Sequence, residues 1–103
     1  MSQLNPEGNV TDVPGYRAGA TYSGIKTYGE GKLDLGILAA DFPCTVAATF
    51  TKNRFRSAAV EVNVAHLQDG RARAVIVNSG CANSSTGQQG IDDAEEMAAL
   101  VGR

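Results

Sequence analysis

The chain has 103 residues and a mass of 10.7 kDa, which is enough for one domain or part of one but not for two. Its 9 basic and 11 acidic residues give a net charge of −2, which is typical neither of a basic nucleic-acid-binding protein nor of an acidic tail. The longest apolar runs, such as residues 74–77, are far shorter than the ~20 residues that a membrane-spanning helix needs. The first eight residues lack the basic and apolar regions of a secretory signal. We therefore expect a cytoplasmic protein with no nucleic-acid or membrane partner.

Small side chains dominate the apolar content of the chain. Apolar residues make up 43% of the sequence, but alanine alone accounts for 15 residues, against 22 for valine, isoleucine, leucine and phenylalanine together. Tryptophan is absent. Few large side chains are therefore present to fill a core, and such a segment would gain stability by packing on something else.

The first half of the chain has the pattern of strands and turns. Residues 1–8 are polar and predict a flexible lead-in, and the folded segment is expected over residues 9–103. Between residues 9 and 32 five glycines alternate with three tyrosines, which favours strands and turns over a helix, with one turn at Val13-Pro14-Gly15. Residues 33–40 have few polar side chains and predict a strand buried on both faces.

Further strands are expected toward the middle of the chain. Residues 44–51 predict an antiparallel neighbour of the preceding strand, joined to it by a turn at residues 41–43. Lys52, Arg54 and Arg56 lie on a cationic bend that we expect to be solvated. Val60, Val62 and Val64 alternate with polar residues, which predicts another strand, followed by at most one helical turn near residues 65–68.

The last third of the chain places a polar loop between a strand and a helix. Residues 73–77 are the clearest candidate for a buried strand, and residues 78–87 after them are nearly all small or polar. Apolar residues then recur at helical spacing, with carboxylates in the first turns, so a helix is expected from Gly87 or Gly90 to about Val101. This order puts Thr86 and Gly87 at a helix N-terminus, where backbone N–H groups attract negative charge.

Three kinds of site fit this loop. The first is a phosphate-binding loop, but Gly87 and Gly90 supply only half of the G-x-G-x-x-G motif, and no Gly-Lys-Ser or Gly-Lys-Thr occurs. The second is a turn whose hydroxyl and amide side chains only cap the helix. The third is an oxyanion hole, in which a hydroxyl and a backbone N–H stabilise the negative oxygen that develops during acyl transfer. The loop by itself does not decide between them.

Several segments, taken in order, carry a resemblance to a known family. Residues 15–18 and 23–26 read G-Y-R-A and S-G-I-K, residues 32–38 read K-L-D-L-G-I-L, residues 47–54 read A-A-T-F-T-K-N-R, and residues 75–90 read V-I-V-N-S-G-C-A-N-S-S-T-G-Q-Q-G. Together they resemble the N-terminal part of the alpha chain of the ornithine acetyltransferase family, the bifunctional glutamate N-acetyltransferases. The resemblance implies an α+β fold of stacked β-sheets flanked by helices, of which this chain would be the N-terminal portion.

The resemblance also implies a function. Members of this family cleave themselves into two chains and move an acetyl group from N-acetylornithine to glutamate through an acetyl-threonine intermediate. By this resemblance Thr86 and Gly87 are the catalytic residues of this chain, as its oxyanion hole. The nucleophilic threonine belongs to the second chain, the beta chain, of an expected alpha2beta2 assembly. No resident cofactor is implied, although acetyl-CoA is a candidate co-substrate. The alternative is a non-catalytic module that binds a small metabolite or only has a structural role.

The remaining reactive side chains favour ordinary structural roles. Cys44 and Cys81 lie 37 residues apart and form no cluster with His66, the single histidine, so neither a metal site nor a redox pair is expected. Cys81 stands where the family usually has Asn, and Ser85 stands where it often has Cys. The acidic residues at the start of the last helix are expected to be helix-end charges rather than metal ligands; they are Asp92, Asp93, Glu95 and Glu96.

Overall fold

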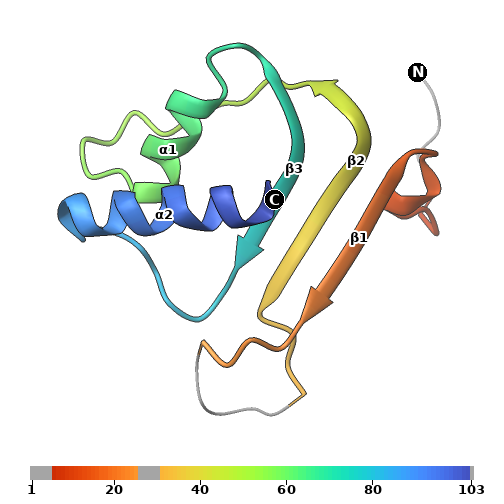
Figure 1. Ribbon diagram of the computed structural model, residues 1–103, viewed down its shortest axis with the longest axis horizontal. Helices are drawn as coiled ribbons and strands as arrows, with labels where there is room; N and C mark the ends of the chain where they lie inside the picture. The colour runs from red at the N-terminus through yellow and green to blue at the C-terminus, as the bar shows by residue number, and fades with distance from the viewer. Residues whose placement is uncertain (1–5, 26–30, 103) are drawn as a thin grey trace.

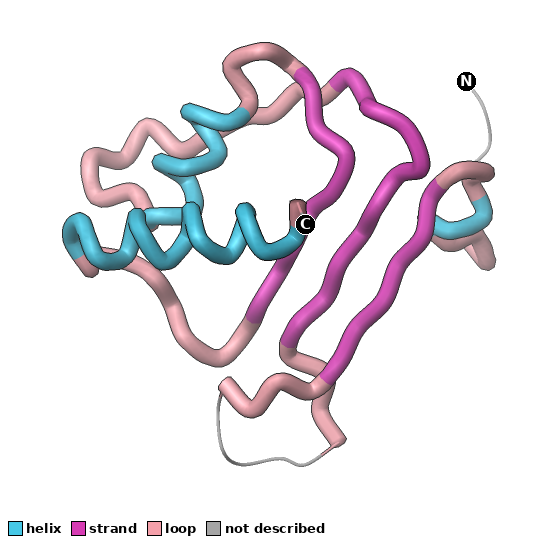
Figure 2. The backbone as a smooth tube through the Cα atoms, viewed as in Figure 1, coloured by secondary structure: helices cyan, strands magenta, loops and turns pink. Residues whose placement is uncertain are grey.

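The computed structural model describes residues 6–25 and 31–102, which form an α+β arrangement of one sheet and two helices (Figures 1 and 2). In chain order the elements are the 3-10 helix η1 (Val10–Asp12), β1 (Tyr16–Thr21), β2 (Leu35–Thr45), α1 (Ala58–His66), β3 (Arg71–Asn78) and α2 (Gly87–Val101). The three strands are antiparallel in the order β1-β2-β3, so β2 is the central strand. Both α-helices lie on the β3 side of the sheet (Figure 1). The predicted helix from Gly87 to Val101 is confirmed.

The structure describes only part of the predicted lead-in and only part of the segment rich in glycine and tyrosine. Residues 1–5 and 26–30 lie outside the described residues, and residues 6–8 are exposed. The described residues contain a single sheet, so the stacked sheets expected from the family resemblance are not part of them. None of the described helices is long and apolar enough to cross a membrane.

Strand β2 is longer than the sequence indicated. The turn predicted at residues 41–43 is wrong, because the chain continues through them as one bent strand and pairs with β3 on both sides of a register shift. Ala39 lies opposite Ala74, and the next paired residue is Cys44, opposite Ala72. Pro43 lies in this interval and has no N–H to donate to a neighbouring strand, which is why proline is found at bulges.

Helix α1 replaces a predicted strand. The alternation of Val60, Val62 and Val64 predicted an extended segment, and this prediction is wrong. The Ser57 side chain accepts a hydrogen bond from the Val60 backbone N–H at 3.4 Å, so it caps the helix at its N-terminus. Ala58 and Val62, four residues apart, are buried on the same face. A strand would have put every valine on one face, whereas the helix needs only Val62 in the core.

The core consists of small side chains. The buried apolar residues are Ala40, Ala58, Val62 and Ala94, and no large side chain is fully buried in the described part of the chain. The last three form one cluster between α1 and α2, with Ile91 beside it. Residues 33–40, predicted as a strand buried on both faces, are mostly half-buried, and residues 73–77, predicted as a buried strand, are mostly exposed. The helices pack mainly on each other, and α2 reaches the sheet only at β3.

A tight turn leads into β1, as predicted for the Pro-Gly pair. The Tyr16 N–H donates to the Val13 carbonyl at 3.3 Å, and Gly15 has a φ of +91°. A Cβ atom at Gly15 would lie 2.5 Å from the ring of Phe42, which itself meets the Tyr16 ring edge-on at 5.9 Å. Glycine is therefore required here by both the backbone angle and the space.

Replacing Gly15 should destabilise the protein. We expect Gly15→Ala to lower the free energy of unfolding by about 1–3 kcal/mol, because alanine is strained at positive φ and its methyl group displaces Phe42. Gly19→Ala is the matched control, since a Cβ there meets no atom within 4 Å and the φ is not positive. Urea unfolding followed by circular dichroism gives both values. Equal losses in the two variants would contradict this account of the turn.

Candidate functional site

The loop between β3 and α2 has a tightly turned backbone. It leaves the end of β3 at Asn78 and reaches the N-terminus of α2 at Gly87 (Figure 1). Three of its residues have positive φ: Gly80 at +102°, Ser85 at +55° and Gly87 at +64°. Such angles are uncommon for a residue other than glycine, so Ser85 marks a locally constrained backbone. Thr86 and Gly87 are brought to the helix N-terminus, as the sequence predicted.

Asn83 connects this loop to both helices. Its side-chain Nδ2 donates to the Gly90 carbonyl of α2 at 2.8 Å, and its Oδ1 accepts a short hydrogen bond from the Thr86 hydroxyl. Its backbone carbonyl accepts from the N–H of Ala58, the first residue of α1, at 2.9 Å. One half-buried residue therefore links the loop to both helices, to α1 through its backbone carbonyl and to α2 through its side chain.

Gly90 makes room for this arrangement. A Cβ atom on Gly90 would overlap the Thr86 Oγ1 and the Asn83 Oδ1. From the sequence, Gly90 was considered as part of an incomplete phosphate-binding motif and as a possible start of the helix, and Asn83 was not singled out. The sequence did contain a signal for Gly90. A glycine in the first turns of a helix lowers helix stability by about 1 kcal/mol relative to alanine, so its presence indicates that another group lies close to its backbone.

Thr86 does not cap the helix with its side chain. It occupies the N-cap position of α2, with φ −102° and ψ 3°, and its side chain makes no capping hydrogen bond within the described structure. Nothing described lies within 4 Å of the position that a Cβ on Gly87 would take. The first N–H groups of a helix have no acceptor inside it. The N-terminus of α2 is therefore open to a group with negative charge.

Asp34 holds the β1–β2 loop and the start of the candidate loop together. Its carboxylate accepts hydrogen bonds from the Ser23 N–H at 2.6 Å, the Ser23 hydroxyl at 2.9 Å, and the N–H groups of Gly24 and Ile25, both at 3.1 Å. Its backbone carbonyl accepts from the Ser79 N–H at 2.9 Å. These bonds, above all the one from the Ser23 N–H, lower the pKa of Asp34 because they favour its charged form.

His66 and Arg56, which lie outside the loop, are held in structural contacts. His66 Nε2 lies 2.8 Å from Glu95 Oε2 and links α1 to α2. Arg56, at the end of the cationic bend, pairs with Glu61 at 2.9 Å. Both cysteines are free thiols, Cys44 half-buried and Cys81 exposed. No group of three potential metal ligands occurs in residues 6–25 and 31–102.

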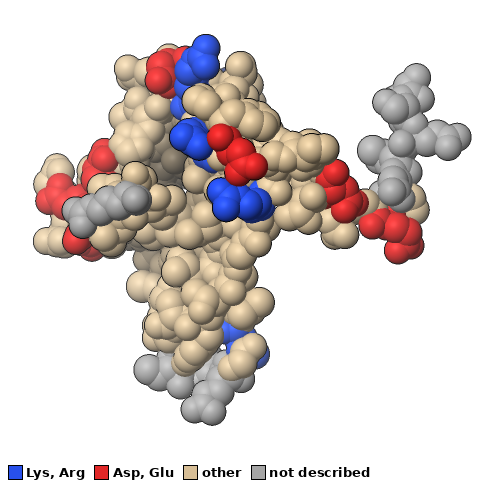
Figure 3. Space-filling view, turned by 45° about the vertical axis from the view of Figure 1, so that its right-hand side comes forward, with Lys and Arg blue, Asp and Glu red and all other residues tan. Residues whose placement is uncertain are grey.

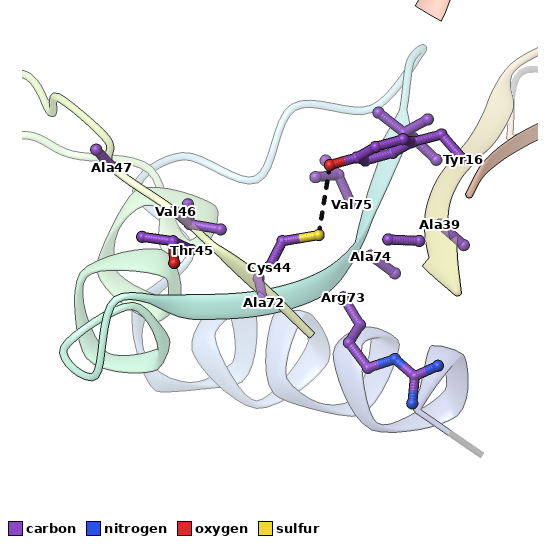
Figure 4. A pocket seen from close by; sticks show the side chains of 12 residues that line it. Tyr16, Ala39, Cys44, Thr45, Val46, Ala47, Ala72, Arg73, Ala74 and Val75 are labelled. Carbon is purple, nitrogen blue, oxygen red and sulfur yellow. Dashed lines mark hydrogen bonds between the residues drawn. The ribbon is translucent and has the colours of Figure 1, made fainter. Parts of the chain in front are cut away.

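A cavity of about 290 Å³ lies at the bend of β2, away from the candidate loop. Figure 4 shows Tyr16, Cys44 and Val75 around it, with the Tyr16 hydroxyl 3.5 Å from the Cys44 Sγ. The hydrogen bond with Cys44 raises the pKa of Tyr16, because it stabilises the protonated phenol. None of the residues that line the cavity belongs to the loop that carries Thr86, so the two features are separate.

Charged side chains of both signs are mixed on the molecular surface. Figure 3 shows basic and acidic groups next to one another on this face of the molecule. Arg17 pairs with Asp41 at 3.1 Å, and Arg73 donates to the Asp41 carbonyl at 3.0 Å. The charge in this region is therefore locally compensated.

Comparison with known proteins identifies the family to which this α+β segment belongs. The model of the ArgJ family matches residues 17–103. The arginine biosynthesis bifunctional protein ArgJ of Dehalococcoides mccartyi is 48% identical over 92 residues, which are 89% of this chain and 23% of that protein. The corresponding protein of Geobacter sulfurreducens is 41% identical over 90 residues, which are 87% of this chain and 22% of that protein. The chain therefore belongs to the ArgJ family and spans about a fifth of the length of these relatives.

Solved structures agree with this assignment. The crystal structure of ArgJ from Bacillus halodurans superposes with a TM-score of 0.82 at 36% identity, over 90% of this chain and 48% of that chain. Ornithine acetyltransferase from Mycobacterium tuberculosis, solved in complex with ornithine, gives a TM-score of 0.77 at 41% identity, over 86% of this chain and 46% of that chain. The α+β arrangement of the described residues is therefore that of part of an ArgJ chain.

Neutralising the Asp34 carboxylate should change the pH dependence of stability. The pKa of Asp34 in the folded state is below that of an ordinary aspartate, so its stabilising effect is present above the ordinary pKa and is lost as the pH falls through the folded-state pKa. We expect Asp34→Asn to lower the melting temperature at pH 7, and the difference from the wild type to narrow in acid.

Melting curves between pH 7 and pH 3 test this expectation. Asp93→Asn is the matched control, because the Asp93 carboxylate lies on the surface of α2 and accepts a side-chain hydrogen bond from Gln89 at 2.8 Å. It should lower the melting temperature less than Asp34→Asn at pH 7. A constant difference between Asp34→Asn and the wild type over the whole range would contradict the role of the charge.

Proposed function

We propose that this chain is the part of an acetyltransferase that supplies the oxyanion hole, formed by the Thr86 hydroxyl and the Gly87 N–H. The reaction is transfer of an acetyl group from N-acetylornithine to glutamate through an acetyl-threonine intermediate. Membership of the ArgJ family supports this proposal, as do the arginine-biosynthesis relatives and the relative solved with ornithine. In that reaction Thr86 and Gly87 donate hydrogen bonds and do not attack the substrate.

The observation that carries the proposal is the uncapped N-terminus of α2. The Thr86 side chain makes no capping bond to the helix, and the space around Gly87 is open in the described structure. Acetyl transfer passes through a tetrahedral intermediate whose carbonyl oxygen becomes negative. Donors fixed at a helix N-terminus stabilise that oxygen, and the helix dipole has the favourable sign there. Glycine at position 87 also leaves no Cβ between the N–H and the reacting group.

The rest of the machinery is assigned to the remainder of the enzyme. The proposal places the nucleophilic threonine on a beta chain within an alpha2beta2 assembly, with acetyl-CoA as a candidate second acetyl donor. The chain covers about a fifth of the length of its relatives, so the substrate contacts and the base are expected on segments outside it. The cytoplasmic location stays a prediction; some relatives, including that of Sclerotinia sclerotiorum, are named as mitochondrial proteins.

One observation favours the alternative of a structural loop. The single proton of the Thr86 hydroxyl is donated to Asn83 in this structure, so the loop satisfies its own hydrogen bonds. If that were its only role, removing the hydroxyl would weaken the fold and leave turnover unchanged. The two candidate functions therefore differ in their prediction for the loss of the Thr86 hydroxyl. An oxyanion hole predicts a lower kcat, whereas a structural loop predicts a less stable fold with unchanged turnover.

The main effect of Thr86→Ala should be on kcat rather than on the melting temperature. In the complete enzyme we expect kcat to fall by roughly 10²–10³ with little change in KM, because the lost donor acts on charge that exists only near the transition state. Melting temperature and kcat are measured on the same preparation, with Thr11→Ala, an exposed threonine outside the loop, as the control. A lowered melting temperature with normal kcat would refute the oxyanion assignment.

Gly87→Ala should also lower kcat, for a different reason. A residue other than glycine is strained at φ +64°, so the backbone N–H is expected to move away from the position that it takes in the oxyanion hole. Self-cleavage should slow too, because it passes through a tetrahedral oxyanion. Gly31→Ala is a close control, with φ +88° and open space around it, but outside the loop. Equal losses of kcat in both variants would show that backbone strain alone is responsible.

The chain by itself should be inactive. Purified residues 1–103 are expected to transfer no acetyl group from N-acetylornithine, because the nucleophile belongs to a segment outside them. The measurement is formation of N-acetylglutamate in the presence of glutamate, compared with the complete enzyme. Turnover at a comparable rate would place the nucleophile on this chain and overturn the proposal.

A further inference from the structure

We propose that Asn83 is a positioning residue for Thr86: its amide fixes the direction of the Thr86 hydroxyl and accepts its proton until an oxyanion competes for it. This inference rests on the proposed function, since it concerns the same site. It assigns no contact between Asn83 and the substrate. Asn83 acts only through Thr86.

The orientation of the Asn83 amide follows from its partner on α2. The Gly90 carbonyl can only accept a hydrogen bond, and it lies 2.8 Å from one end of the amide, so that end must be the NH₂ group. The other end, Oδ1, then faces the Thr86 Oγ1. Because an amide oxygen can only accept, Thr86 must be the donor in that contact. The direction of the hydroxyl proton is therefore set by the Gly90 carbonyl through Asn83.

The position of Asn83 is itself fixed by the backbone. Its carbonyl is bonded to the N–H of Ala58 at 2.9 Å, and Ala58 is buried in the cluster between the helices. Gly90 is buried as well, and a Cβ on it would overlap both Thr86 Oγ1 and Asn83 Oδ1. The Thr86 hydroxyl, the Asn83 amide and the Gly90 backbone are therefore packed closely against one another.

This arrangement has a consequence for catalysis. Thr86 has one hydroxyl proton, so it cannot donate to Asn83 and to an oxyanion at the same time. When the carbonyl oxygen of the substrate becomes negative, the O–H group turns from the Asn83 Oδ1 toward it, and no covalent bond changes. A hydrogen bond to a charged acceptor is about twice as strong as one to a neutral amide, so this exchange is favoured only as the charge develops.

A double-mutant cycle in the complete enzyme tests the inference. The variants are Thr86→Ala, Asn83→Ala, Asn83→Asp and each Asn83 variant combined with Thr86→Ala, with kcat, KM and melting temperature measured for all. Asn63→Asp controls for the added charge, because Asn63 is an exposed asparagine on α1 whose side chain has no hydrogen-bond partner among the described residues. We expect kcat to fall about 3- to 10-fold in Asn83→Ala and further in Asn83→Asp, because a carboxylate holds the Thr86 proton more strongly. KM should change little.

In the Thr86→Ala background, neither Asn83 substitution should lower kcat by more than about twofold, because Asn83 then has no hydroxyl to orient. Equal effects of the Asn83 substitutions with and without Thr86 would overturn the inference, as would a normal kcat in both Asn83 variants. Those outcomes leave the proposed function intact as long as Thr86→Ala lowers kcat. If Thr86→Ala leaves kcat unchanged, the proposed function itself fails.

If Asn83→Asp does not accumulate as folded protein, the cycle with Asn83→Ala decides by the same criteria. Gly90→Ala gives a second route, since its methyl group displaces both side chains without changing their chemistry. It should lower kcat in the wild-type background and not in the Thr86→Ala background. A loss of the same size in both backgrounds would contradict the inference.

Discussion

The hydrogen bonds of Asn83 hold together the part of the chain on which the candidate site depends. One side chain and one backbone carbonyl join the loop to the first turns of α1 and α2, through Ala58 and Gly90. The two helices meet in the small apolar cluster formed by Ala58, Val62 and Ala94. The position of Thr86 at the N-terminus of α2 is therefore coupled to the packing of the two helices. A loop of small polar residues becomes an ordered site because it is bonded to the helices, not because it contains a core of its own.

The sequence predicted the elements whose signals are local. The Pro-Gly turn, the strand that ends near residue 78 and the helix from Gly87 to Val101 follow from turn chemistry, apolar runs and helical spacing, and the structure confirms them. The expected strand at residues 60–64 was wrong, because valine alternation was given more weight than the cap at Ser57. The expected turn at residues 41–43 was wrong, because Pro43 can lie in a bulge as well as in a turn.

The sequence indicated which loop carries the candidate site, but it did not indicate the contacts that hold that loop in place. Thr86 and Gly87 were found through the family resemblance together with the strand, loop and helix order. The contact of Asn83 with Gly90 spans seven residues and depends on the path of the loop, which includes the positive φ of Ser85. The local conformational preference of serine does not indicate that Ser85 adopts a positive φ. The reason for a glycine at position 90, the close approach of two side-chain oxygens, exists only in three dimensions.

An enzyme must stabilise the transition state more than the ground state. The proposed roles of the uncapped N-terminus of α2 and of the Thr86 hydroxyl, which donates to Asn83, fit this requirement. A neutral carbonyl oxygen is a poor competitor for the Thr86 proton, because Asn83 already accepts it in a fixed geometry. A negative oxygen at the N-terminus of α2 is a better acceptor than the amide and is also favoured by the helix dipole. Under the proposed function, the net gain from Thr86 would therefore be small when the substrate binds and would grow as the charge forms. A hydroxyl left unbonded in the resting state would instead bind the substrate carbonyl early, and part of its effect would be lost to ground-state binding.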